Sequence, residues 1–224
     1  MPLIKPFTGL RPASGRADDV VAPPYDVMNA DEARQMVEGR PWSFLHISRP
    51  EVDLPAGTDP YSAAVYAKAA ENLNNMVEEG VLVRDPKDSY YVYRLTMGEH
   101  VQTGLVAAAS VEAYDNDRIK KHEFTRPVKE DDRVRQVEAL NAQTGPVFLV
   151  YKANQVVDDL LKTVSSSAAD VDVTAKDGVR HEIWVLSDDD KLNTVTSSFD
   201  VIDASYVAGV KHPCAVGSRV CIRM

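Results

Sequence analysis

Residues 90–110 read Tyr-Tyr-Val-Tyr-Arg-Leu-Thr-Met-Gly-Glu-His-Val-Gln-Thr-Gly-Leu-Val-Ala-Ala-Ala-Ser. Aromatic and aliphatic residues gather there in two runs, and we predict strands over Tyr90–Met97 and Val101–Ser110. The connection Gly98-Glu99-His100 has the length of a hairpin loop. Gly104 and three consecutive alanines in the second run indicate close packing against another layer. The pattern therefore predicts an antiparallel hairpin that packs against a second layer.

Two helical patterns precede this hairpin. Asn29 and Glu32 have the spacing of a capping box, and the short helix that they begin is expected to end near Gly39. A longer helix is predicted between residues 59 and 80, because apolar residues recur there at helical spacing between an Asp-Pro start and a Gly stop. Between the two helices, Ser43–Ser48 is predicted to form a strand.

The elements after the hairpin alternate irregularly. A helix is predicted after the polar segment 115–132, with Val134, Val137 and Leu140 on its apolar side. The remaining predicted elements are a strand over Val147–Tyr151, a helix over Val156–Val164, strands over Val171–Thr174 and Arg180–Leu186, and a helix over Asp188–Ser198. Because this order lacks the strict alternation of a doubly wound protein, we predict an α+β fold with mixed, partly antiparallel sheets and flanking helices.

Composition and charge narrow the classes of partner. The chain has 224 residues, of which 44% are hydrophobic and 26% charged, as in globular proteins. Its formal net charge of −9 argues against nucleic acid or a membrane as partner, because both require an extended positive surface. No apolar run approaches the length that spans a bilayer, and the N-terminus lacks the apolar core of a signal peptide. We therefore expect a cytoplasmic protein.

One segment of this acidic chain is basic. Residues 118–135 hold seven Lys and Arg against four Asp and Glu, a local net charge of +3. Pro127 suits the first turn of a helix, whose free backbone N–H groups would add to phosphate binding by the cations. The alternative is a solvated loop and helix with ordinary ion pairs, such as Lys129 with Asp132. The segment is thus a candidate anion site.

Two further places could present functional side chains. The stretch Val20–Val27 contains Pro23 and Pro24, which force an extended backbone and present Tyr25 and Asp26 from a rigid turn. Arg49 follows the end of a predicted strand, where binding residues often lie, although it could simply pair with Glu51. Turns stiffened by proline are more often structural than catalytic, and that alternative stays open for Tyr25 and Asp26.

Standard motifs for metals and nucleotides are missing. His122-Glu123 is not followed by the second histidine that a zinc-protease helix requires. No dinucleotide, P-loop or hydrolase-elbow motif occurs. Both cysteines, Cys214 and Cys221, lie in the last eleven residues, which excludes a disulfide framework or a cysteine-based zinc site in the body of the chain. We assign no metal site.

Four segments together resemble a known family. They are Pro6-Phe-Thr-Gly-Leu-Arg-Pro12, Val21-Ala-Pro-Pro-Tyr-Asp-Val27, Ser43-Phe-Leu-His-Ile-Ser-Arg-Pro-Glu51 and Lys121-His-Glu-Phe-Thr-Arg-Pro-Val-Lys-Glu-Asp-Asp-Arg133. The chain is similar over about residues 2–206 to the bacterial and archaeal family called domain of unknown function 1015. Its members normally continue with an Asp-Gly-His-His-Arg motif that is similar to the phosphate-binding loop of the ParB and sulfiredoxin superfamily. That superfamily includes nucleotide hydrolases and free serine kinases.

The resemblance implies a nucleotide-dependent phosphotransferase that acts on a small hydroxyl metabolite such as free serine, with ATP or ADP and Mg²⁺ as cofactors. Under this interpretation Lys129 and Arg133 clamp phosphate, assisted by Lys121, Tyr25, Asp26 and Arg49. Glu123 or Asp132 would accept the hydroxyl proton or hold Mg²⁺, and His122 and Thr125 would orient the substrate or phosphate by hydrogen bonds. The alternative is a non-catalytic module that binds a phosphorylated metabolite or a nucleotide through the same cations.

The last residues depart from the family pattern. Residues 1–206 are interpreted as the N-terminal part of the catalytic or binding unit, with a sub-boundary near 151–155, and 207–224 as a divergent tail. A frameshift near residue 209 would explain this tail, and the alternative is a natural short form. In either case the chain lacks the later motif, and an inactive fragment is a third interpretation. The apolar strand at residues 147–150 would then favour aggregation or a homo-oligomer.

Overall fold

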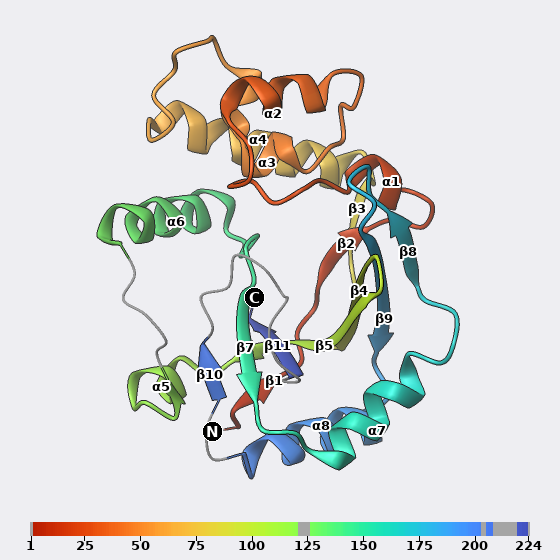
Figure 1. Cartoon of the computed structure of the whole chain (residues 1–224). Helices are drawn as coiled ribbons and strands as arrows, with labels where there is room; N and C mark the ends of the chain where they lie inside the picture. The colour runs from red at the N-terminus through yellow and green to blue at the C-terminus, as the bar shows by residue number, and fades with distance from the viewer. Residues whose placement is uncertain (1, 121–125, 203–204, 208–218, 224) are drawn as a thin grey trace. The chain divides into compact units, whose positions relative to one another are not determined.

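Figure 1 shows a computed structural model of the chain, which describes residues 2–120, 126–202, 205–207 and 219–223. The chain divides into two units, each assembled from segments that are distant in sequence. The first, here called the sheet unit, contains residues 1–9, 84–124 and 145–224. The second, the helical unit, contains residues 10–83 and 125–144.

Nine strands of the described residues form the mixed sheet of the sheet unit. Their order is β6-β10-β7-β11-β5-β4-β9-β8, and β1 also pairs with β5. Their bounds are β1 Ile4–Lys5, β4 Tyr90–Met97, β5 His100–Ala109, β6 Ile119–Lys120, β7 Val147–Tyr151, β8 Val171–Thr174, β9 Arg180–Leu186, β10 Ser205–Val207 and β11 Arg219–Arg223. The pairs β10–β6 and β11–β5 are parallel, while the other pairs are antiparallel. The predicted α+β class with a mixed sheet is confirmed.

The predicted hairpin is formed by β4 and β5. Met97 pairs with His100, so the loop is only Gly98-Glu99, one residue shorter than expected. Gly98 has φ +60°, which suits a hairpin turn with glycine at its first central position. Val92, Leu105 and Trp184 lie in register on β4, β5 and β9, and all three are buried. All three residues belong to the buried core of the sheet unit.

Helices complete the core of the sheet unit. They are α5 (Val111–Asp115), α7 (Gln155–Val164) and α8 (Asp189–Asp200). Val157 and Leu161 of α7 and Val195 and Phe199 of α8 belong to the same buried cluster as the strands. Asp188 caps α8 by accepting a hydrogen bond from the Lys191 backbone N–H, as the Asp run at its start favours. The helices predicted here are confirmed to within two residues at each end.

The helical unit is built around two longer helices. Its helices are α1 (Ala17–Val20), α2 (Ala30–Val37), α3 (Leu45–Ser48), η1 (Pro50–Asp53), α4 (Ala63–Glu78) and α6 (Pro127–Leu140), and its two-stranded sheet pairs β2 (Leu10–Pro12) with β3 (Leu82–Arg84). Its core combines Ile47 of α3, Leu73 and Met76 of α4 and Leu140 of α6. The predicted capping box of α2 is confirmed, with Asn29 accepting two backbone hydrogen bonds.

The strand predicted at Ser43–Ser48 is wrong, because this segment contains α3. The backbone N–H groups of Ile47 and Ser48 both donate to the Phe44 carbonyl, so the backbone satisfies itself locally. A short apolar run does not distinguish a buried strand from a buried helical turn. The start predicted for α4 at Asp59-Pro60 is also early, because Asp59 forms a turn with Tyr61 and the helix begins at Ala63.

The apolar side predicted for α6 is mostly wrong. Val134 and Val137 are 49% and 36% exposed, and only Leu140 of the predicted set is buried. The buried residues of α6 are Asp132, Gln136 and Leu140, which follow one another at intervals of four. Gln136 Nε2 donates to the Ile47 carbonyl at 3.2 Å, so this polar side chain has a specific buried partner. Burial of a partnered polar group cannot be read from hydrophobic periodicity.

Candidate functional site

The helices α4 and α6 run in the same direction, and both begin at one end of the helical unit (Figure 1). The hydroxyl of Tyr61, just before α4, lies 3.3 Å from Lys129 Nζ in the first turn of α6. Further along both helices, the Tyr66 hydroxyl meets Asp132. The N-terminus of a helix carries a partial positive charge. The N-termini of α4 and α6 therefore both lie near Lys129.

Lys129 and its neighbours offer donors at this end. The Lys129 side chain donates to Tyr61 Oη and lies 5.8 Å from the centre of the Tyr61 ring. Within the described residues it forms no ion pair with a carboxylate. Ser62 stands at the N-cap position of α4, and its buried Oγ has no hydrogen-bond partner in the described part of the chain. An ammonium and two hydroxyls thus surround the start of α4.

Asp132 links the two helices and is 8% exposed. Its Oδ1 accepts a hydrogen bond of 2.9 Å from the Tyr66 hydroxyl, and its Oδ2 accepts two from Arg133, one of 2.7 Å from Nη2 and one of 3.2 Å from Nε. Burial raises the pKa of Tyr66 to about 12, and the hydrogen bond from Tyr66 to the Asp132 carboxylate adds to the effect. Tyr66 is therefore a protonated donor at neutral pH, and both oxygens of Asp132 are engaged.

Tyr25, in the proline-stiffened loop at residues 20–27, also contacts Arg133. The Arg133 guanidinium carbon lies 4.6 Å from the centre of the Tyr25 ring, a cation–π arrangement. Arg49 fixes this loop, because its Nη1 donates to the carbonyls of Tyr25 and Met28 at 2.8 Å each. Arg49 Nε also donates to Glu51 at 2.6 Å, and both side chains are largely buried. Arg49 is thus placed to position the loop that carries Tyr25.

Five of the residues predicted from sequence come together here. They are Tyr25, Arg49, Lys129, Asp132 and Arg133. Asp26 is exposed on the same loop. The predicted residues Lys121, His122, Glu123 and Thr125 lie outside the residues that the structure describes.

Three residues of the cluster were not predicted: Tyr61, Ser62 and Tyr66. Tyr66 is one of the apolar residues at helical spacing in the helix predicted between residues 59 and 80, and its only further signal is the hydroxyl, which usually has a partner when an aromatic residue is buried. Asp132 pairs with Arg133 in place of the expected Lys129.

Metal-ligand clusters and membrane-spanning helices are both missing from the residues that the structure describes. No group of three or more His, Cys, Asp and Glu side chains could hold a metal ion there. None of the described helices combines the length and apolar character needed to cross a membrane.

Comparison with known proteins gives one match. A family model described as "Protein of unknown function (DUF1015)" matches residues 4–222. No curated protein and no solved structure matches the chain.

Proposed function

This chain belongs to the DUF1015 family, and on that premise we propose that its helical unit binds a small phosphorylated metabolite where α4 and α6 begin. The observation that carries the proposal is the convergence of two helix N-termini with Lys129 and Arg133 in an acidic protein. Backbone N–H groups at helix starts and charged side chains together form the usual protein site for a phosphate group.

Lys129 and Arg133 differ in how readily each can bind an anion. Lys129 is exposed, and its side-chain contacts among the described residues are with the hydroxyl and the ring of Tyr61. It can therefore bind an anion without breaking an ion pair. Arg133 is 38% exposed at its side chain and shares its guanidinium with Asp132. Because Tyr25 stacks under that guanidinium, Arg133 can exchange one hydrogen bond to Asp132 for one to phosphate while its plane stays oriented.

Lys129→Gln tests the proposed binding. Pyrophosphate is the probe, titrated by calorimetry at low salt. We expect the affinity to fall about tenfold or more, because a charge-assisted hydrogen bond contributes roughly 1.5–3 kcal/mol.

The matched control is Lys162→Gln, which removes an equal charge from an exposed position on α7. Equal affinities of the two variants, or no binding of pyrophosphate by the parent chain, would contradict the proposal.

A second candidate function is that of a nucleotide-dependent phosphotransferase. The position of Asp132 beside the cations Lys129 and Arg133 favours it. ATP with Mg²⁺ would supply the terminal phosphoryl group, and a small hydroxyl compound such as free serine would accept it. A new P–O bond forms to the hydroxyl oxygen while the P–O bond to the leaving diphosphate breaks. Asp132 would take the hydroxyl proton at Oδ2 once Arg133 withdraws both of its hydrogen bonds from that oxygen.

Asp132→Asn separates the two candidates. The amide still accepts the hydrogen bond from Tyr66 but cannot take a proton at neutral pH. For a phosphotransferase, we expect ATP-dependent phosphorylation of serine to fall about a hundredfold or more, while pyrophosphate is bound at least as tightly as by the parent because Arg133 loses its ion pair. Turnover by the variant at the parent rate would remove Asp132 as the base. A parent chain that binds pyrophosphate but never turns over would favour the binding module.

A further inference from the structure

We propose that the helical unit holds a second small-molecule site, a cavity between α3, η1 and α4 that takes a planar, hydrogen-bonding ring carrying one anionic group. The cavity has a volume of about 420 Å³, and small-molecule sites in proteins have volumes of roughly 300–1,000 Å³. Its lining residues are Pro41, Trp42, His46, Asp53, Lys68, Asn72, Asn75 and Met76. All of them belong to the helical unit.

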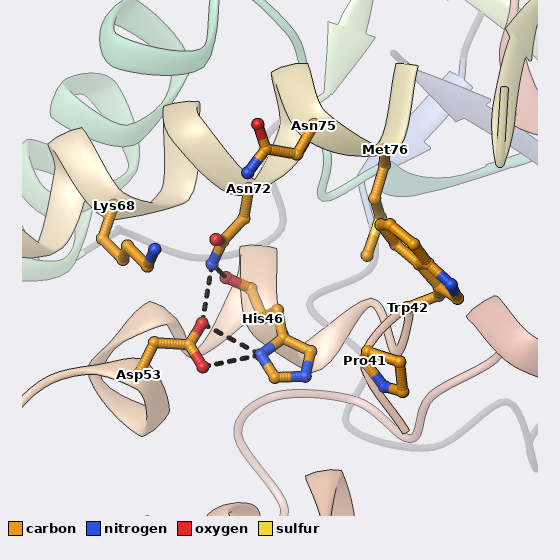
Figure 2. Close-up of a pocket in the computed structure, with 8 residues that line it drawn as sticks. All are labelled: Pro41, Trp42, His46, Asp53, Lys68, Asn72, Asn75 and Met76. Atoms are coloured by element: carbon orange, nitrogen blue, oxygen red, sulfur yellow. Dashed lines mark hydrogen bonds and ion pairs between the residues drawn. The ribbon is translucent and has the colours of Figure 1, made fainter. Parts of the chain in front are cut away.

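One side of the cavity is apolar. Figure 2 shows Trp42 beside Met76 there. Met76 is 1% exposed and belongs to the core of the unit, so this wall is held in place by packing against the core. Trp42 packs against the same core and is only partly buried, which leaves part of its ring to the cavity. An indole beside a buried thioether offers a flat surface on which a planar ring can stack.

The opposite side is a hydrogen-bonded polar wall (Figure 2). Asn72 Nδ2 donates to the His46 carbonyl at 2.7 Å and to Asp53 Oδ2 at 2.8 Å. Asp53 also lies 2.9 Å from His46 Nδ1. These contacts join α3, η1 and α4, so the polar groups keep their places without a ligand. Preorganised groups of this kind cost little to order on binding.

The wall does not suit catalysis by His46. Its Nε2 lies 3.1 Å from the Arg40 carbonyl and its Nδ1 lies against Asp53, so both ring nitrogens face oxygen acceptors. A histidine that acts as a base needs one nitrogen directed at the substrate. His46 therefore orients Asp53, and the cavity is a binding site by its chemistry.

The chemistry of the ligand follows from the polar groups of the cavity that still have hydrogen-bonding capacity or charge to offer. Asn72 uses its amide nitrogen twice, which leaves its Oδ1 and the remaining lone pairs of Asp53 as acceptors for ring N–H donors. Lys68 brings a positive charge, and its partner Glu71 is 60% exposed at the side chain. Because exposed ion pairs of this kind are weak, an anionic substituent of the ligand can replace Glu71 at Lys68.

This site is independent of the phosphate site proposed above. Lys68 follows Tyr66 by two residues, which is about 200° around α4, so the two lie on nearly opposite sides of that helix. Lys129 and Arg133 do not line the cavity. Failure of one proposal therefore leaves the other intact.

Four probes separate the parts of the ligand. Orotate combines a planar ring, ring N–H donors and a carboxylate, whereas uracil lacks the carboxylate, benzoate lacks the ring N–H groups and acetate lacks the ring. We expect calorimetry to show orotate binding at least about tenfold more tightly than each of the other three, because it alone meets the stacking, acceptor and Lys68 contacts.

Two variants locate that binding. Lys68→Gln is expected to lower orotate affinity about tenfold, to the level of uracil, and Trp42→Leu to weaken both ring probes. Lys162→Gln, which removes an equal charge from an exposed position on α7, is the control and is expected to bind orotate like the parent. Melting temperatures of all variants show whether the fold is kept, and Lys68→Gln retains the test if Trp42→Leu does not fold. Equal binding of orotate and uracil, no binding of orotate, or unchanged binding by Lys68→Gln would overturn the proposal.

Discussion

Gly9→Ala is expected to lower the free energy of unfolding of the sheet unit by about 3 kcal/mol, because it overpacks a buried position. A Cβ at residue 9 would lie 2.5 Å from Tyr91 Oη and 2.7 Å from Tyr91 Cζ. Contacts this short require either the backbone or the tyrosine to move. The expected effect is therefore set by how firmly Tyr91 is held.

Tyr91 has little freedom to move. Its hydroxyl donates to Asp85 at 2.8 Å and accepts from the Gly9 N–H at 2.7 Å. Its backbone is paired on both sides, with Val106 and with Val185, and its ring packs against Phe7 with centroids 5.2 Å apart. A new methyl group at residue 9 would thus break buried hydrogen bonds as well as displace the ring.

Gly145→Ala is the matched control for this prediction. Nothing lies within 4 Å of a Cβ built there, and its φ is not in the left-handed region. We expect a change within about 0.5 kcal/mol of the parent, as for surface substitutions in general. Urea unfolding, followed by Trp184 fluorescence in a Trp42→Phe background, measures both variants. Equal midpoints for the two would contradict the overpacking argument.

Asp132→Ala is expected to destabilise the helical unit by about 3 kcal/mol, because it leaves the buried Tyr66 hydroxyl and the Arg133 guanidinium without their shared partner. The loss also removes the only side-chain hydrogen bond between α4 and α6 found among the described residues. We therefore expect faster amide hydrogen exchange in α6 than in the parent.

The neighbouring aspartate provides the control. Asp131 pairs with Arg135 at 2.8 Å, but both side chains are more than half exposed. Asp131→Ala is expected to cost about 0.5 kcal/mol or less, because exposed pairs on a helix contribute little. If the two alanine variants lost the same free energy of unfolding, the contact with Tyr66 would contribute nothing to stability. The role of Asp132 would then be purely functional.

The candidate site was predicted in part. The basic segment and the proline-stiffened loop drew attention to Tyr25, Arg49, Lys129, Asp132 and Arg133, and these residues do lie together in the helical unit. Their roles in binding stay a prediction. The cavity beside Trp42 was not predicted, because its lining comes from several short elements and no sequence motif connects them.

Local sequence was sufficient wherever the stabilising interactions are local. The β4–β5 hairpin, the capping box of α2 and the Asp188 cap of α8 follow from residues a few positions apart, which contact one another in any surroundings. The polar buried face of α6 depends on partners that are remote in sequence. Gln136 is buried where it donates to the Ile47 carbonyl, and Asp132 is buried where it accepts from the Tyr66 hydroxyl. The free energy of a buried polar group depends on the partner that tertiary packing places beside it, and hydrophobic periodicity contains no information about that partner.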